Sequence, residues 1–364
     1  MEAAVAEGWD SYGRIVATLI RVTGDWTLAE DCAQEAMAAA LERWPRDGAP
    51  RNPGGWLLTV ARNRAIDVLR RAAVEKTKLA EVAMLWDPAG PPAEEIEDDR
   101  LRLIFTCCHP ALALEARVAL TLRTVAGVPT ADIARAFLVT ETAMTRRITR
   151  AKTKIADARI PYRVPAGPAL AERLPGVLAV LYLLFTRGYD ADGEPAFADE
   201  AIRLARLLTG LMPAEPEVAA LLALFLLQHS RRAARRDEAG DLVMLERQDR
   251  ARWDRAAIAE ALAVLPPDPP GPYALQARIA ACHATARTAA ETDWPAIAGW
   301  YDELARIGST PVIELNRAVA HGYAFGPAAG LALLDAVRRD QALDPMAIAV
   351  EADLRARAGE RERA

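Results

Sequence analysis

The sequence predicts an all-helical protein built from more than one domain. Alanine and leucine are abundant, runs of β-branched residues are scarce and aromatic residues make up only 6% of the chain, a composition that favours helices over sheets. Apolar residues recur at helical spacing through most of the sequence, and two proline-containing segments, 87–99 and 161–168, interrupt them. A chain of 364 residues is long enough for about two or three domains.

Composition narrows the class of protein. The formal net charge of −5 argues against attachment to nucleic acid through bulk charge, but it leaves room for a local basic patch. Four cysteines in a chain of this length do not make a disulfide framework. The N-terminus lacks the pattern of a secretory signal, and the longest apolar run, residues 218–227, is too short to cross a membrane. We therefore expect a cytoplasmic protein with no membrane partner.

Residues 10–75 are expected to form two amphipathic helices. Asp25 is placed as the N-cap of a helix over 29–44, and Pro45 is expected to end it. A loop with prolines and glycines leads to a second helix over 56–71.

The polar faces of these two helices are candidate binding surfaces. One face of the first helix carries acidic and amide side chains: Glu30, Asp31, Gln34 and Glu35. A polar cluster follows Trp56 in the second helix: Arg62, Asn63, Arg64, Asp67, Arg70 and Arg71. Asparagine and arginine can hold unstacked bases and phosphates, and an acidic face can meet a basic protein surface. The alternative for each helix is an exposed polar face that contacts only water and has no binding role.

Residues 87–99 change the character of the chain. They hold three prolines, six acidic residues and no basic residue, which is typical of a solvated linker. We therefore predict a first domain over 1–76, an acidic linker over 77–99 and a second domain over 100–160.

The second domain has the pattern of a helix-turn-helix. Helices are expected over 101–105, 111–125, 131–137 and 141–158, with Thr130 capping the third helix and a turn at 138–140. The apolar stripe of the last helix consists of Met144, Ile148, Ala151 and Ile155.

The opposite face of that last helix is suited to a DNA major groove. It carries Thr142, Arg146, Thr149 and Thr153, with Arg150 at its edge. Arginine reads guanine, and threonine reads base edges or a thymine methyl group. Arg147, Lys152 and Lys154 lie on the flanks, where phosphate contacts are expected. The alternative is a solvated basic face on a core helix.

From residue 169 to the end, nearly everything is expected to be helical. The predicted helices are 169–187, 197–210, 215–235, 250–265, 272–288, 294–307, 311–323, 327–339 and 345–358. Pro311 and Pro345 stand 34 residues apart and each opens a helix, which matches the tetratricopeptide period. We therefore predict an irregular tetratricopeptide-like helical-repeat domain over 169–364.

Several segments together resemble a known family. Ala29-Glu30-Asp31, Gln34-Glu35, Trp56-Leu57, the run 61–67 and Arg70-Arg71 are similar to region 2 of bacterial sigma factors of the extracytoplasmic-function type, and the run 150–155 is similar to their region 4. The order of region 2, acidic linker and region 4 is also that of the family. In the tail, segments 181–185, 188–189, 200–204, 248–250 and 315–319 resemble a subgroup with a long tetratricopeptide-like C-terminal extension.

The resemblance implies a promoter-specificity subunit of RNA polymerase. Core polymerase, through its β′ clamp helices and β flap, and promoter DNA would be the partners, and a regulatory protein or ligand would act on the extension. Glu30, Asp31, Gln34 and Glu35 match the face that docks on the clamp helices. The cluster that includes Trp56 would melt the −10 element and capture a flipped base. The last helix of region 4, with Thr145 added to its predicted DNA face, would read the −35 element.

The sequence departs from the subgroup pattern at three places. Arg146 stands where glutamine is usual, so the −35 preference is expected to differ. Thr186-Arg187 replaces an asparagine-glutamate pair, and the helical array is expected to end early.

The alternatives to a sigma factor are a DNA-binding regulator and an enzyme. A polymerase-independent helix-turn-helix regulator that senses a ligand or protein through its repeats would bind promoter DNA alone. An enzyme would need ionisable groups converging in a cleft, and the sequence shows no catalytic, cofactor or metal motif. Cys107-Cys108-His109-Pro110 lacks further ligands at zinc spacing. We predict a structural helix junction there, with a redox or metal role as the alternative.

Overall fold

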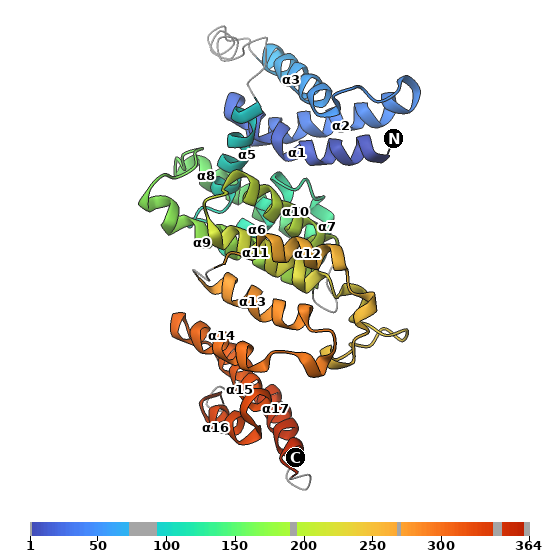
Figure 1. The fold of residues 1–364 in the computed structure, drawn as a ribbon. Helices are drawn as coiled ribbons and strands as arrows, with labels where there is room; N and C mark the ends of the chain where they lie inside the picture. The colour runs from blue at the N-terminus through green and yellow to red at the C-terminus, as the bar shows by residue number, and fades with distance from the viewer. Residues whose placement is uncertain (1, 73–92, 190–194, 268–270, 338–343, 360–364) are drawn as a thin grey trace. The chain divides into compact units, whose positions relative to one another are not determined.

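The computed structural model describes residues 2–72, 93–189, 195–267, 271–337 and 344–359. Within these ranges α-helices provide nearly all of the regular structure, supplemented by short 3-10 turns and one isolated β-bridge between Arg236 and Leu242. The all-helical prediction is therefore confirmed for the described part of the chain (Figure 1). The chain divides into two compact units, residues 1–200 and 201–364, which are described separately.

The first unit begins with three helices, α1 (Glu2–Thr23), α2 (Trp26–Asp47) and α3 (Pro53–Ala72), which pack against one another. Asp25 caps α2 as predicted, because its carboxylate accepts hydrogen bonds from the Thr27 and Leu28 amides at 2.9 and 3.0 Å. The prediction that Pro45 ends this helix is wrong. A proline near a helix end removes only one hydrogen bond, so α2 continues to Asp47 and stops at Gly48, whose φ is 82°.

Four helices form the next part of the first unit: α5 (Ala93–Cys107), α6 (Leu114–Thr124), α7 (Thr130–Ala136) and α8 (Glu141–Asp157). Because α5 begins at Ala93, residues 93–99 of the predicted linker are helical, while residues 77–92 lie outside the described residues. Thr130 is the first residue of α7 rather than its cap. Thr140 caps α8, since its hydroxyl accepts from the Ala143 amide at 3.2 Å.

Helix α1 joins these two groups of helices by packing against α5 as well as α2 and α3. Gly13 allows α1 to approach the end of α6 closely, because a Cβ at that position would lie 2.5 Å from the Val125 carbonyl oxygen. The carboxylate of Asp99, which is fully buried, pairs with Arg21 of α1 at 2.8 Å and with Arg102 at 2.6 Å. The prediction of a solvated linker therefore fails at Asp99, where burial of the carboxyl requires these cationic partners.

Helix α9 (Pro168–Tyr189) completes the first unit and packs against α5 and α6. It is long and apolar enough to cross a membrane by length and composition alone, a property that core helices of soluble proteins share. Leu174, Val177, Leu181 and Phe185 are among its buried side chains. We therefore assign α9 to the core of this unit.

The remaining helices follow α9 along the chain. They are α10 (Pro195–Leu211), which spans the division between the units, and α11 (Pro216–His229), α12 (Arg255–Val264), α13 (Pro272–Thr285), α14 (Trp294–Ile307), α15 (Pro311–Phe325), α16 (Pro327–Val337) and α17 (Asp344–Arg357). From α13 onward each helix packs against the next, and α11 packs against both α12 and α13. Such neighbour packing is compatible with a helical repeat, and the tetratricopeptide-like repeat itself stays a prediction.

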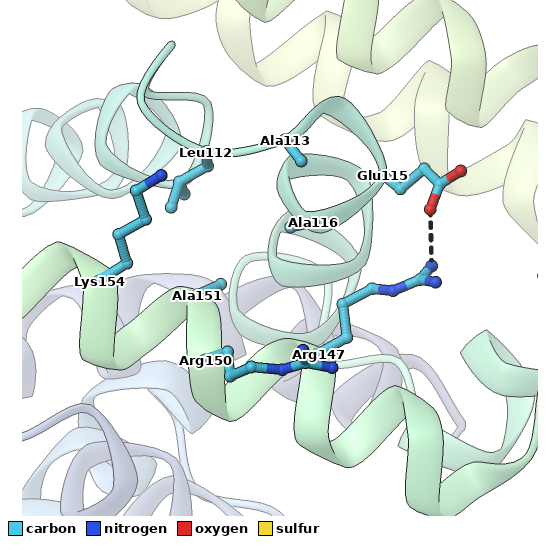
Figure 2. Close-up of a pocket in the computed structure, with 8 residues that line it drawn as sticks. All are labelled: Leu112, Ala113, Glu115, Ala116, Arg147, Arg150, Ala151 and Lys154. Carbon is cyan, nitrogen blue, oxygen red and sulfur yellow. Dashed lines mark ion pairs between the residues drawn. The ribbon is translucent and has the colours of Figure 1, made fainter.

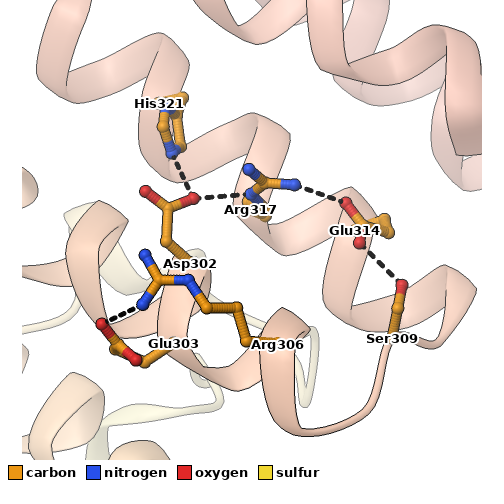
Figure 3. A network of polar contacts seen from close by, with 7 residues as sticks. All are labelled: Asp302, Glu303, Arg306, Ser309, Glu314, Arg317 and His321. Atoms are coloured by element: carbon orange, nitrogen blue, oxygen red, sulfur yellow. Dashed lines mark hydrogen bonds and ion pairs between the residues drawn. The ribbon is translucent and has the colours of Figure 1, made fainter.

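Several predicted helices in this part differ at their ends from the structure. The helix predicted over 215–235 ends at His229, and the one predicted over 250–265 begins at Arg255, where Asp254 caps it by accepting from two amides. The helix predicted over 272–288 ends at Thr285. A set of side chains ties α14 to α15: Asp302 accepts from Arg317 at 2.7 Å and bonds His321 at 3.1 Å (Figure 3). His321 therefore lies in a structural contact between α14 and α15.

Candidate nucleic-acid and protein interfaces

Helix α8 is built as the sequence predicts for a recognition helix. Met144, Ile148, Ala151 and Ile155 are all buried, with at most 6% of each residue exposed. The predicted DNA-facing side chains that are exposed are Thr142, Thr145, Arg146, Thr149, Arg150, Thr153 and Lys154. Helical spacing fixes both faces, because the apolar stripe must face the core. A basic surface with interspersed threonines therefore stands open to solvent.

A hollow of about 370 Å³ adjoins this surface between α6 and α8 (Figure 2). Arg147, Arg150 and Lys154 line it from α8, and Glu115 and Ala116 line it from α6. Glu115 pairs with Arg147 at 3.2 Å and so offsets one of the three cations. Arg150 and Lys154 are exposed beside this hollow, where they can meet a phosphate group.

Two predicted phosphate contacts on α8 are engaged with protein groups. Arg147 pairs with Glu115, and its guanidinium lies 5.8 Å from the centre of the Phe137 ring. Lys152 is only 16% exposed, and its Nζ atom lies 2.8 Å from Glu30 Oε1 on α2. A helical wheel places both residues on flanks but cannot show which protein groups face those flanks.

Glu30 is buried, unlike the exposed face predicted for it. Only 4% of the residue is exposed. Its carboxylate accepts from Thr124 Oγ1 at 3.0 Å, and it also lies near Lys152 and Arg123, with Arg123 Nε at 3.4 Å from Oε2. The buried charge is stabilised by these partners, all of which come from the helix-turn-helix part of the chain.

The other residues of the predicted α2 face are exposed. Asp31, Gln34 and Glu35 all face solvent. The Gln34 amide, oriented with its oxygen toward Arg123, accepts from Arg123 Nη1 at 3.2 Å. Glu35 accepts from Arg64 Nη2 of α3 at 3.2 Å. The acidic and amide face of α2 and the polar cluster of α3 therefore lie next to each other, because Glu35 of the α2 face pairs with Arg64 of the α3 cluster.

The predicted −10 residues lie along α3. Trp56 is half-buried and packs edge-on against Trp44, with ring centres 5.6 Å apart. The exposed members of the cluster are Asn63, Asp67, Arg70 and Arg71, while Arg62 and Arg64 are half-buried. The surface therefore presents amide, carboxylate and guanidinium groups together.

Helix α9 supplies contacts that the sequence did not assign. The Arg173 guanidinium donates to the Phe105 carbonyl oxygen and lies 5.7 Å from that ring, and burial lowers the pKa of Arg173. Arg187 Nη1 donates to the Ala136 carbonyl oxygen at 3.1 Å and lies 5.1 Å from the Phe137 ring. The first helix of the predicted extension thus touches both α5 and the turn of the helix-turn-helix. The sequence marked Arg187 only as an unusual residue.

The Cys107-Cys108-His109 segment lies where α5 ends. Both thiols are buried, and Cys108 Sγ lies 3.6 Å from Thr121 Oγ1. Burial raises the pKa of Cys107 well above its usual value and raises the pKa of Cys108 to about 11. His109 Nδ1 accepts from the Ala111 amide at 3.2 Å. These contacts favour the structural helix junction, since protonated, buried thiols are poor nucleophiles and metal ligands.

Three stretches of the chain match known families. Residues 10–74 match Sigma-70 region 2, residues 102–155 match Sigma-70 region 4, and residues 173–267 match a family of unknown function, DUF6596. The first two stretches contain α2, α3 and most of α8, which carry the predicted binding residues. No solved structure matches the chain.

The relatives agree with these matches. An uncharacterized protein of Rhizobium meliloti is 46% identical over 336 residues, covering 88% of this chain and 79% of that protein. The probable RNA polymerase sigma factor RfaY of Xanthomonas campestris is 30% identical over 168 residues, covering 42% of this chain and 41% of RfaY. The probable ECF RNA polymerase sigma factor SigI of Mycobacterium tuberculosis is 27% identical over 163 residues, covering 43% of this chain and 56% of SigI.

Region 2 precedes region 4 in this chain, and α8 of the region 4 match carries an exposed basic face. Sigma factors of this kind are typically cytoplasmic, non-enzymatic proteins that bind core RNA polymerase and promoter DNA. The chain belongs to the extracytoplasmic-function sigma factors of the sigma-70 family and carries an additional C-terminal domain from a family of unknown function.

Proposed function

We propose that this sigma factor divides promoter-specific initiation among three parts of the chain. Residues 1–76 bind core polymerase and melt the −10 element, residues 100–160 read the −35 element, and residues 169–364 control the activity of both. The matches to region 2 and region 4 support the first two assignments.

The assignment of core binding to α2 rests on its acidic and amide face. Asp31, Gln34 and Glu35 present carboxylate and amide groups to solvent, which suits a basic helical surface such as the β′ clamp helices. Glu30 joins this face only when its present partners are displaced.

The assignment of DNA recognition rests on α3 and α8. On α8, Arg146 and Arg150 can donate bidentately to guanine, while Thr145 and Thr149 suit base edges and Lys154 suits phosphate. On α3, Asn63 and Asp67 offer hydrogen bonds to an unstacked base, and the arginine pair at 70–71 offers charge for the backbone.

Control by the C-terminal extension is supported by one observation above all, the contact of α9 with region 4. Arg187 bonds the end of α7 and lies against Phe137, and the Arg147 guanidinium of α8 lies near the same ring. A change in the position of α9 would therefore alter the packing of Phe137 and Arg147 at the recognition helix α8. A protein or ligand that binds the extension is expected to act through this contact.

Run-off transcription with core polymerase tests this proposal. The full-length protein is compared with a chain shortened to residues 1–194, which keeps α9 on region 4, and with the full-length Arg187→Ala variant. Arg306→Ala, which removes an exposed arginine paired with Glu303 on the same helix, is the matched control. Altered initiation by the shortened chain and by Arg187→Ala, with normal initiation by the control, is expected. Equal transcription by all four proteins would contradict control by the extension.

A further inference from the structure

The Glu30 cluster connects region 2 to region 4 through charge. We define it as Glu30 on α2 with Arg123, Thr124 and Lys152 of region 4. The carboxylate oxygens of Glu30 lie 2.8 Å from Lys152 Nζ, 3.0 Å from Thr124 Oγ1 and 3.4 Å from Arg123 Nε. Thr124 is fully buried, while Lys152 and Arg123 are only 16% and 18% exposed.

Burial makes these groups dependent on one another. A carboxylate with almost no access to water is stable only when cations and hydrogen-bond donors replace its hydration. Here two cations and one hydroxyl group do so, and all three come from one side of the contact. Separating α2 from α6 and α8 would therefore return Glu30 and Lys152 to water together.

The contact also occupies groups that the proposed function needs elsewhere. Glu30 belongs to the proposed polymerase-binding face, and Lys152 belongs to the proposed −35 surface. Lys152 Nζ cannot bind a phosphate while it pairs with Glu30, and Glu30 cannot meet a basic polymerase helix while region 4 covers it.

We propose that the Glu30 cluster is an intramolecular latch, in which region 4 occupies part of the polymerase-binding face of region 2 and region 2 holds a DNA-binding lysine of region 4. The inference rests on the proposed function, since it uses the roles proposed for Glu30 and Lys152. The partner that opens the latch is a protein surface with basic side chains, which replaces Arg123 and Lys152 at Glu30. Core polymerase is that partner in the proposed function.

Opening by either partner favours binding of the other. A basic protein surface at Glu30 releases Lys152 for DNA, and a phosphate at Lys152 removes one cation from Glu30. Because linkage is reciprocal, polymerase binding and DNA binding strengthen each other by the same factor. The free sigma factor then binds DNA with an affinity reduced by the small fraction of molecules that are open.

Variants that weaken the latch without touching a proposed binding residue test this inference. Thr124→Val removes the hydroxyl group at nearly constant volume, and Arg123→Gln removes one cation. The matched control is Arg135→Gln on α7, which loses the same charge from an ion pair with Asp132 of its own helix. The probe is a mixed-sequence DNA duplex of about 30 base pairs at low salt, where phosphate contacts dominate binding.

The double variant Arg123→Gln/Thr124→Val is expected to bind this duplex about tenfold more tightly than the wild type, because a larger fraction of molecules is open. Loss of a cation alone has the opposite effect, so Arg135→Gln is expected to bind no more tightly than the wild type. A double variant that binds no better than Arg135→Gln overturns the latch. Should the double variant be unfolded by circular dichroism, the isosteric Thr124→Val variant decides by the same comparison, with a severalfold gain expected.

Association of the labelled wild-type protein with core polymerase distinguishes a failure of the latch from a failure of the proposed function. Wild-type protein that does not associate with core polymerase refutes the proposed function, whatever the duplex affinities are. Wild-type protein that associates with core polymerase, combined with no gain in duplex affinity by the variants, refutes the latch alone. Faster association of the double variant with core polymerase is expected, because the α2 face is exposed more often.

Discussion

Replacing Gly13 by alanine probes the close packing of α1 against region 4. An alanine Cβ would lie 2.5 Å from the carbonyl oxygen of Val125, about 1 Å inside ordinary van der Waals contact. The oxygen belongs to the backbone and cannot rotate aside as a side chain would. Helix α1 must therefore move away from the end of α6.

The expected magnitude is the balance of two effects. Overpacking at a tight contact costs about 1–3 kcal/mol, while alanine stabilises a helix interior over glycine by about 0.5–1 kcal/mol. We therefore expect Gly13→Ala to destabilise the packing of α1 by about 1–2 kcal/mol in net terms. Gly299→Ala on α14 is the matched control, since nothing lies within 4 Å of a Cβ there, and it should be stabilising.

Hydrogen exchange of peptides from α1 and α6, measured by mass spectrometry, is a suitable assay because it reports local opening. A loss of about 1–2 kcal/mol corresponds to exchange about 5–30 times faster in these two helices. Peptides from α14 should exchange as slowly as before in Gly13→Ala. Unchanged or slower exchange of α1 and α6 in Gly13→Ala would refute the tight contact between α1 and region 4.

Three further predictions concern other parts of the chain. Burial lowers the pKa of His283 from 6.5 to about 4. Between these pH values the unfolded chain binds the proton more readily than the folded chain, so up to about 3 kcal/mol of stability is lost as the pH falls from 6.5 to 4. Urea unfolding of the His283→Phe variant should not show this loss of stability. With core polymerase present, Arg150→Ala should weaken binding of a promoter duplex about tenfold or more in anisotropy measurements, whereas Arg306→Ala should leave it unchanged. Thr140→Ala removes the cap of α8 and should destabilise that helix by about 1 kcal/mol, measured as faster hydrogen exchange in its first turn.

Local patterns explain what the sequence could predict. The limits of α14 agree with the predicted helix over 294–307, because Asp293 caps it and an apolar stripe runs along it. The buried stripe of α8 likewise follows from spacing alone, so the exposed Arg146 and Arg150 on its other side were predictable. These features depend on residues within one helix.

Contacts between distant segments explain what the sequence could not predict. Helical spacing puts Glu30 on the polar face of α2, yet Thr124, 94 residues away, covers it. Asp99 was assigned to a solvated linker from local composition, but it bonds Arg21, 78 residues away, and burial raises the pKa of its carboxyl despite that cation. No local pattern carries information about such partners, and the acidic composition of 87–99 pointed away from burial.

The match to sigma factors resolves the choice that residue patterns alone left open. A helix-turn-helix with a basic second helix suits both a sigma factor and a polymerase-independent regulator. Region 2 before region 4 distinguishes the two, because only a sigma factor requires the first part. The C-terminal family is of unknown function, so its role rests on the contacts of α9.

Promoter binding that depends on core polymerase is the decisive property of a sigma factor. Fragments of the source genome are incubated with core polymerase, with and without this protein, and the bound fragments are sequenced and used as templates for run-off transcription. We expect that a defined set of fragments with shared −35 and −10 elements is bound and transcribed only when both proteins are present. Enrichment of fragments by this protein alone, with no transcript added to those of core polymerase, would contradict it.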